Sequence, residues 1–271
     1  AEPPYANPAR ELQCFNGLGG FSADGREYIA MVRPERMTPV PWINVLANPW
    51  FGTFISESGS AHTWSENAQM FRLTPWSNDP VSDTNTEAFY LRDEDSGHYW
   101  SPTLLPCANP GAVHGVRHGF GYSVFEHCDS GIASELMVFV AQDAPVKFAI
   151  LKLHNRSGRK RRLSATGYVE WVLGEERSKT AMQVVTQRDT YSGAVLALNA
   201  FDHAQETREQ RAVRNNQVGP AGQQQAFVAV TNGRLHFAHN DLQVRAALFA
   251  QIVQLLGQVE QFMAVVDPDD N

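Results

Sequence analysis

Residues 132–155, IASELMVFVAQDAPVKFAILKLHN, decide the fold class because they contain two long apolar runs separated by a turn-forming break. Within SELMVFV, residues 134–140, side chains alternate, so that every second one can face a core while its neighbours meet water or a second layer. The break, AQDAP, contains Asp and Pro, which commonly bound strands. The stretch therefore predicts two β-strands, 132–140 and 146–155.

Short apolar runs bounded by Gly, Pro, Asn, Asp and Ser continue along most of the chain, and convincing helical patterns are scarce before residue 200. A length of 271 residues suits one large domain. The strand spacing therefore predicts a single all-β, many-stranded sandwich over residues 1–271. Further strands are predicted at 27–32, 51–56, 87–93, 122–128, 162–173, 182–187, 194–199 and 226–230.

Two late segments need separate interpretation. Residues 246–266, AALFAQIVQLLGQVEQFMAVV, fit a helical stripe, yet the central Gly257 would cost a helix about 1 kcal/mol relative to Ala. A hairpin of LFAQIVQL and VEQFMAVV, joined at 256–258, is the preferred prediction. Residues 202–224 are polar and rich in Gln and Arg, which predicts a surface insertion between core segments at about 12–200 and 225–266.

The charge balance argues against a nucleic-acid partner. The formal net charge is −7, so binding through phosphates would need a concentrated basic face. The one basic run is RSGRKRR, residues 156–162, which lies between two predicted strands and is interpreted as a charged hairpin turn. Three cysteines without a CxxC pair fit a reducing compartment, and no apolar run is long enough to span a membrane.

Motifs for cofactors and metals are weak. The glycine-rich NGLGGFSADG, residues 16–25, lacks the third glycine and the strand–helix context of a dinucleotide fingerprint. HGVRH places His114 and His118 four residues apart, but the surrounding glycines favour a loop or strand edge, and the glutamate of a zincin motif is missing. No cofactor and no metal site are therefore predicted.

The segment HTWSENAQMFRLTPWSNDPVSD, residues 62–83, concentrates aromatic and hydrogen-bonding side chains without a regular period. Flat indole rings suit the C–H faces of sugars, and neighbouring carboxylates and amides suit the hydroxyls. Tryptophans also fill sandwich cores and Asn-Asp-Pro forms turns, so the residues alone leave sugar binding and structural roles as equal alternatives. The residues in question are Trp64, Trp76 and Trp100, with Glu66, Asn67, Asn78 and Asp79.

Longer strings carry a resemblance to a known family. They are LQCFNGLGGFSADGREYIA, TPVPWINVLANPWFGTFISESGSAHTWSENAQMFRLTPWSNDPVSD, EAFYLRDEDSGHYWSPT, VRHGFGYSVFEH and GYVEWVLG. Together they resemble the N-terminal β-sandwich of glycoside hydrolase family 94, formerly glycosyltransferase family 36, as found in bacterial cyclic β-1,2-glucan synthases and 1,2-β-oligoglucan phosphorylases. The likeness runs from about residue 12 to 200 and resumes at 225.

The resemblance implies a galactose-mutarotase-like supersandwich of two large antiparallel sheets. In that family the sandwich precedes an (α/α)6 barrel, which carries the catalytic aspartate and most phosphate and sugar contacts. The chain begins with Ala-Glu-Pro-Pro and ends before any such barrel, so it is interpreted as a domain cut from a larger polypeptide, without catalytic residues of its own. A membrane-bound synthase as the parent would place this domain on the cytoplasmic side.

The resemblance also implies partners: a β-glucan oligosaccharide, the C-terminal (α/α)6 barrel, and a second copy in a homodimer. Two alternatives stay open, namely a purely structural domain that packs on the barrel, and an independent sugar mutarotase or epimerase. The latter would need a converging His and Glu, taken from His114, His118 or His127 and from Glu66 or Glu170. The candidate carbohydrate-binding or interdomain residues are Trp64, Glu66, Asn67, Arg72, Trp76, Asn78, Asp79, Arg117, His118 and Tyr122.

Overall fold

The computed structural model describes residues 12–77, 79, 81–188 and 195–199, together with the backbone of later strands at 226–230, 246–251 and 260–264. Regular structure in these residues is almost entirely β-strand, with one short helix, α1 (Arg177–Thr180). The all-β prediction is therefore confirmed. The predicted insertion at 202–224 lies outside the described residues.

The described strands form three antiparallel sheets of ten, four and three strands. The ten-stranded sheet contains, in spatial order, β1 (Gly19–Phe21), β2 (Glu27–Val32), β8 (His114–Gly119), β9 (Tyr122–Asp129), β10 (Ile132–Val140), β11 (Val146–Asn155), β16 (Ala246–Gln251), β15 (Ala226–Val230), β14 (Val195–Asn199) and β13 (Val184–Arg188). The four-stranded sheet contains β17 (Glu260–Ala264), β12 (Leu163–Val169), β6 (Glu87–Asp93) and β7 (Tyr99–Trp100). The three-stranded sheet contains β3 (Ile43–Asn48), β4 (Phe51–Ser56) and β5 (Ala61–Ser65).

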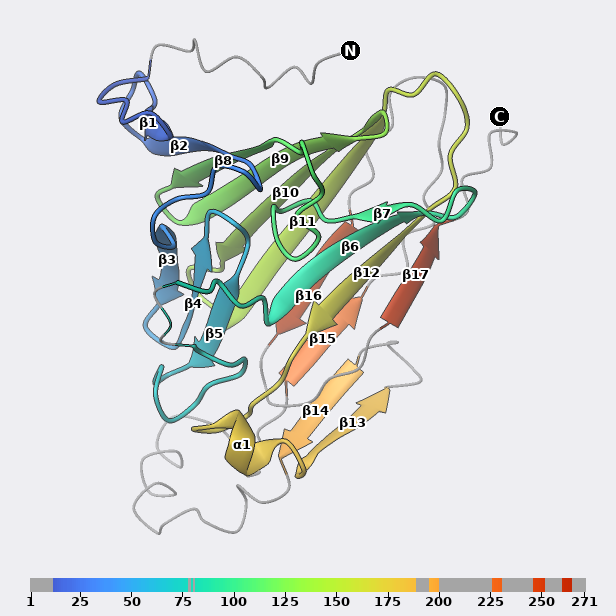
Figure 1. Cartoon of the computed structure of the whole chain (residues 1–271). Coiled ribbons are helices and arrows are strands. Elements are labelled where there is room, and N and C mark those ends of the chain that lie inside the picture. Colours follow the sequence, from blue (N-terminus) through green and yellow to red (C-terminus); the bar gives the residue numbers. More distant parts are fainter. Residues whose placement is uncertain are drawn as a thin grey trace, which may run out of the picture.

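The two smaller sheets cover one face of the ten-stranded sheet (Figure 1). One buried apolar cluster draws side chains from all three sheets, including Leu136 of β10, Leu46 of β3 and Leu91 of β6. The second layer is divided because the segment after β5 folds back along that strand, where the Leu73 amide donates to the Thr63 carbonyl at 2.9 Å. The sandwich is therefore one large sheet facing two smaller ones.

The two strands predicted from residues 132–155 are observed as β10 and β11, with the predicted bounds. They pair antiparallel from Ile132 opposite Asn155 to Val140 opposite Lys147. The predicted strands at 27–32, 51–56 and 87–93 are likewise observed as β2, β4 and β6. Short apolar runs between turn residues were thus a sufficient signal for most strands.

Two predicted hairpins are wrong. Residues 156–162 follow β11 in the ten-stranded sheet and precede β12 in the four-stranded sheet, so the basic run crosses between layers. Residues 246–266 contain strands, as preferred over a helix, but β16 pairs with β11 and β15 while β17 pairs with β12. Alternating side chains predict a strand, but they do not specify its partner, because every half-buried strand shows the same pattern.

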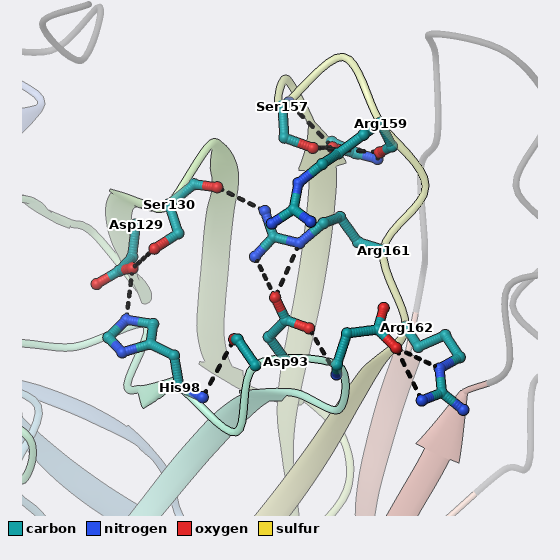
Figure 2. Close-up of polar contacts among 11 residues, drawn as sticks. Asp93, His98, Asp129, Ser130, Ser157, Arg159, Arg161 and Arg162 are labelled. Carbon is teal, nitrogen blue, oxygen red and sulfur yellow. Dashed lines mark hydrogen bonds and ion pairs between the residues drawn. The ribbon is translucent and has the colours of Figure 1, made fainter.

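The basic crossing between β11 and β12 is anchored by a buried ion pair (Figure 2). Arg161 is only 3% exposed, and its Nε and Nη2 donate to Asp93 Oδ2 at 3.0 and 2.7 Å. Its Nη1 donates to the Ser130 carbonyl oxygen, in the turn between β9 and β10, at 2.6 Å. Burial opposes ionisation of Asp93, but the Asp95 amide, the Ser96 hydroxyl and Arg161 outweigh it and lower the Asp93 pKa.

A second, largely buried ion pair joins all three sheets. Lys147 of β11 donates through Nζ to Glu87 Oε2 of β6 at 2.6 Å, and to Thr53 of β4 and Thr63 of β5 at 3.1 and 3.2 Å. Glu87 Oε1 accepts from the hydroxyls of Thr63 and Thr74 at 2.5 and 2.9 Å. Burial opposes ionisation, but Lys147 and these hydroxyls outweigh it and lower the Glu87 pKa.

Replacing Arg161 with Met should lower the free energy of unfolding by about 3–5 kcal/mol, because the Asp93 carboxylate would stay buried without its cation. Urea unfolding followed by circular dichroism measures the loss. The adjacent Arg162 is the matched control, since it is exposed and paired with Asp95 at 2.8 Å. Arg162→Met should cost at most about 1 kcal/mol, and equal losses in the two variants would contradict the anchoring role.

Candidate aromatic binding face

The outer face of the three-stranded sheet is aromatic. In the register of the sheet, Trp64 of β5 lies opposite Gly52 of β4, and His62 lies opposite Phe54. These four residues alternate with Thr53, Ile55 and Thr63, which point into the sandwich. The beginning of the segment 62–83 therefore lies in a strand, and its period-two alternation places His62 and Trp64 on the sheet face opposite the core.

Three of the predicted site residues gather around His62. The His62 ring stacks on Trp64 and Trp76, with ring centroids 5.5 and 6.2 Å away, and the Arg72 guanidinium lies 5.4 Å from the Trp76 centroid. Trp64 is half-buried and Trp76 is 45% exposed, whereas His62 is buried. Trp64, Arg72, Trp76 and His62 form what we call the tryptophan cluster, held by stacking and cation–π contact.

Local backbone features explain why the cluster forms. A Cβ on Gly52 would lie 2.2 Å from the Trp64 ring, so the absence of a side chain there lets the indole lie against β4. Arg72 forms an isolated β-bridge with Trp64, which brings the returning segment beside β5. At the C-terminal end of the segment 62–83, Asp83 Oδ2 accepts hydrogen bonds from the Ser56 hydroxyl at 2.6 Å and from the Ser58 hydroxyl.

The remaining predicted residues of this segment serve turns. Asn67 Oδ1 accepts from the amides of Gln69 and Met70 at 2.8 and 2.9 Å. Asp79 accepts from the Ser82 hydroxyl and the Val81 amide at 2.5 and 2.9 Å, and these bonds lower its pKa. Glu66 is exposed, with a positive φ of 55°. Asn78 lies outside the described residues.

Trp100, for which sugar stacking and core filling were equal alternatives, is 1% exposed and belongs to the main core cluster. Of the two alternatives left open for this residue, the structure therefore shows the core role, because Trp100 lies opposite Leu91 on the inward face of β7. His62 was not predicted. Its position two residues before Trp64 in a strand was the signal that could have found it, since such residues share a face.

The second predicted set lies on strands of the ten-stranded sheet. Glu27 Oε1 accepts from Arg117 Nη1 at 2.8 Å and from the Tyr122 hydroxyl at 2.7 Å. His118 Nδ1 lies 2.9 Å from the Ser123 hydroxyl. Among the described residues, no hydrogen bond, ion pair or ring contact joins Arg117, His118 or Tyr122 to the tryptophan cluster, so the structure does not unite the two sets.

The histidines of HGVRH lie in the interior strand β8 and not in a loop. His114 stacks on His127 with ring centroids 3.8 Å apart. Burial is the larger cause, and the neighbouring His127 the smaller one, that lower the His114 pKa to about 3. Burial also lowers the His118 pKa to about 4. No group of three His, Cys, Asp or Glu suited to a metal occurs within the described part of the chain.

The structure brings no histidine of this group to a glutamate named for a mutarotase site. Glu170 pairs with Arg177, and Glu66 lies beyond β5 in a turn that begins with its amide donating to the Trp50 carbonyl at 2.7 Å. His114 and His127 each place Nδ1 near a backbone carbonyl, of Pro102 and Val113 respectively. These contacts are those of buried structural histidines.

Comparison with known proteins agrees with this fold. The profile described as the glycosyl hydrolase 94 supersandwich domain matches residues 26–238. The chain therefore belongs to glycosyl hydrolase family 94 and corresponds to its supersandwich domain. The family resemblance stated from the sequence motifs is confirmed.

Curated relatives include one synthase and several phosphorylases. The cyclic β-(1,2)-glucan synthase NdvB of Rhizobium meliloti (strain 1021) is 40% identical over 191 residues, which is 70% of this chain and 7% of that protein. The N,N'-diacetylchitobiose phosphorylase of Vibrio furnissii is 30% identical over 68% of this chain and 23% of its own length. The solabiose phosphorylase of Paenibacillus borealis is 26% identical over 58% of this chain and 20% of its length.

The chain thus spans less than a quarter of the length of each of these relatives. In the part of the chain that the structure describes, no helix has the length and apolar character needed to cross a membrane.

The buried histidines should make the domain sensitive to acid. In the unfolded chain they take up protons near pH 6.5, whereas the folded pKa values are about 3 for His114 and about 4 for His118. The unfolded state therefore binds more protons in this window, so stability falls as pH drops from about 6.5 to 4, by about 1.4 kcal/mol per pH unit for each histidine.

Urea unfolding at several pH values measures this slope. His114→Phe keeps an aromatic ring beside His127 but removes the titration, so its slope should be smaller by about one proton. His154→Gln is the control, because His154 is half-buried and lies outside the His114–His127 stack. A slope unchanged by His114→Phe would contradict the assignment.

Proposed function

We propose that this chain is a non-catalytic, carbohydrate-binding accessory domain of a β-1,2-glucan-processing phosphorylase or cyclic β-1,2-glucan synthase. In this proposal a C-terminal (α/α)6 barrel of the parent protein carries out the chemistry. The supersandwich contacts the glucan through the tryptophan cluster on its outer face.

The observation that carries the proposal is the exposed Trp76, placed over His62 and beside Arg72 on the outer face of a sheet. An indole with a guanidinium next to it offers an apolar platform and several hydrogen-bond donors, which suit the two kinds of surface on a sugar. The names of the relatives support a saccharide ligand, because the synthase is named for β-(1,2)-glucan and the two phosphorylases for N,N'-diacetylchitobiose and solabiose. The β-1,2-glucan assignment rests on the 40% identity to the synthase.

A second role, packing against the barrel or against another copy in a homodimer, is favoured by a different feature. Ile43 and Val45 of β3 are exposed on the same outer face, and Val45 lies opposite Phe54. Aliphatic side chains offer no hydrogen bonds to a sugar, so this end of the sheet suits a protein surface. Both roles can coexist because the two groups lie on opposite edge strands of the sheet.

Trp76→Ala should abolish saturable binding of sophorose and longer β-1,2-glucooligosaccharides, because it removes the exposed ring of the cluster. Titration followed by tryptophan fluorescence and by calorimetry measures the change. The control is Phe15→Ala, which also removes an exposed aromatic ring but leaves the cluster intact. Absence of any saturable signal in the unsubstituted chain would contradict the carbohydrate role and favour packing alone.

The isolated 271-residue chain should release no glucose 1-phosphate from β-1,2-glucan in the presence of inorganic phosphate, because the barrel is proposed to supply the catalytic acid. An enzyme-coupled assay for glucose 1-phosphate tests this. Release above the level of a heat-denatured sample would contradict a non-catalytic domain.

A further inference from the structure

The outer face of the four-stranded sheet carries a second group of aromatic side chains. In its register, Arg92 of β6 lies opposite Tyr99 of β7, and Tyr90 lies opposite Thr166 of β12. The alternate residues Leu91 and Trp100 are buried in the core. The four residues of these two pairs therefore face away from the core. Together with Tyr168, opposite Ala88, they form what we call the tyrosine face: Tyr90, Tyr99, Tyr168, Arg92 and Thr166.

The three tyrosines run diagonally across the sheet. Tyr99 of β7 lies opposite Arg92 of β6, which is two residues from Tyr90 on the same strand. Tyr168 of β12 lies opposite Ala88 of β6, two residues from Tyr90 in the other direction. Each step along the row therefore moves one strand across and two residues along. Diagonal neighbours on a sheet are roughly 7–8 Å apart, which makes the row about 15 Å long. Burial and the neighbouring Cys107, Tyr168 and Tyr99 raise the pKa of Tyr90, as expected for phenols that share one patch.

The polar groups of this face are unused within the described residues. The hydroxyls of Tyr28 and Tyr122 are hydrogen-bonded, whereas those of Tyr90, Tyr99 and Tyr168 have no hydrogen-bond partner there. Arg92 has only a long contact of 3.7 Å with Glu94. Tyr99 is 59% exposed and the other two tyrosines are half-buried, so their rings and hydroxyls are accessible.

The chemistry of the face selects its occupant. Among the described residues of β6, β7 and β12, the outward side chains that are exposed or half-buried all end in a hydroxyl or a guanidinium. The outward aliphatic residue among them, Ala88, is buried, unlike the exposed Ile43 and Val45. An amphipathic helix would need aliphatic anchors, so this face does not suit one. The C–H faces of sugar rings suit the tyrosine rings, and the sugar hydroxyls suit the tyrosine hydroxyls. A row of about 15 Å fits an extended saccharide chain better than a single sugar.

We propose that the tyrosine face is a second carbohydrate-binding surface, which holds an extended β-linked glucan chain at a distance from the tryptophan cluster. This inference rests on the proposed function, because it assumes the same class of ligand. Two contacts on one polymer raise its apparent affinity through effective concentration, without a new contact at either site. The surface would therefore select long glucans over short ones.

The test compares sophorose with a long linear β-1,2-glucan in calorimetric titrations of the 271-residue chain. The double variant Tyr99→Ala/Tyr168→Ala should bind the long glucan about tenfold more weakly, while the Kd for sophorose at the tryptophan cluster stays within about twofold. Tyr99→Phe/Tyr168→Phe keeps the rings and should show a smaller loss. Phe15→Ala is the control, and circular dichroism with urea unfolding verifies that each variant is folded.

Unchanged binding of the long glucan by the double alanine variant would overturn the proposal. Equal losses for both ligands would also overturn it, because they would mean one site and not two. A change in sedimentation with no change in glucan binding would assign the face to a second copy of the chain, which likewise overturns it. The proposed function fails separately, when Trp76→Ala leaves sophorose binding intact.

Discussion

The sandwich depends on the largely buried Lys147–Glu87 ion pair, because this network reaches all three sheets. Lys147 belongs to the ten-stranded sheet and Glu87 to the four-stranded sheet. The hydroxyls that contact this pair, of Thr53 and Thr63, belong to the three-stranded sheet. Apolar contacts between layers are not directional and would tolerate a shifted sheet. A buried charge does not tolerate a shift, because losing one partner leaves the other uncompensated. The pair therefore specifies how the divided layer sits on the large sheet.

The divided layer leaves two outer faces with different chemistry. The three-stranded sheet presents an indole and a guanidinium near β5 and aliphatic side chains at β3, whereas the four-stranded sheet presents tyrosines and an arginine. Inner positions on both sheets are occupied by core residues or by the buried ion pairs. Alternation along each strand thus separates the core positions, on the inward face, from the two proposed binding surfaces, on the outward face.

Residue types predicted part of the tryptophan cluster, but they did not predict which of the candidate residues would lie together. Trp64, Arg72 and Trp76 were predicted and do meet, because an aromatic, polar segment between strands has few ways to satisfy its side chains. Asn67 and Asp79 were predicted beside them but cap local turns, and Trp100 is in the core. Arg117, His118 and Tyr122 form a separate group bound to Glu27 and Ser123. Closeness in sequence could not show whether a residue would join the cluster, a turn, the core or a separate group. That outcome depends on which strand the residue belongs to and which face of the sheet it occupies.

The sequence by itself determined the all-β class, the bounds of strands such as β6, β10 and β11, and membership of the family. These follow from local alternation, turn residues and long motifs, all of which are readable along one chain. Only the tertiary structure decided that the basic run crosses between layers, that β16 and β17 belong to different sheets, and that the second layer is divided. The physical reason is that pairing and layer assignment depend on contacts between residues far apart in sequence, such as Arg161 with Asp93, and a local pattern carries no record of its distant partner.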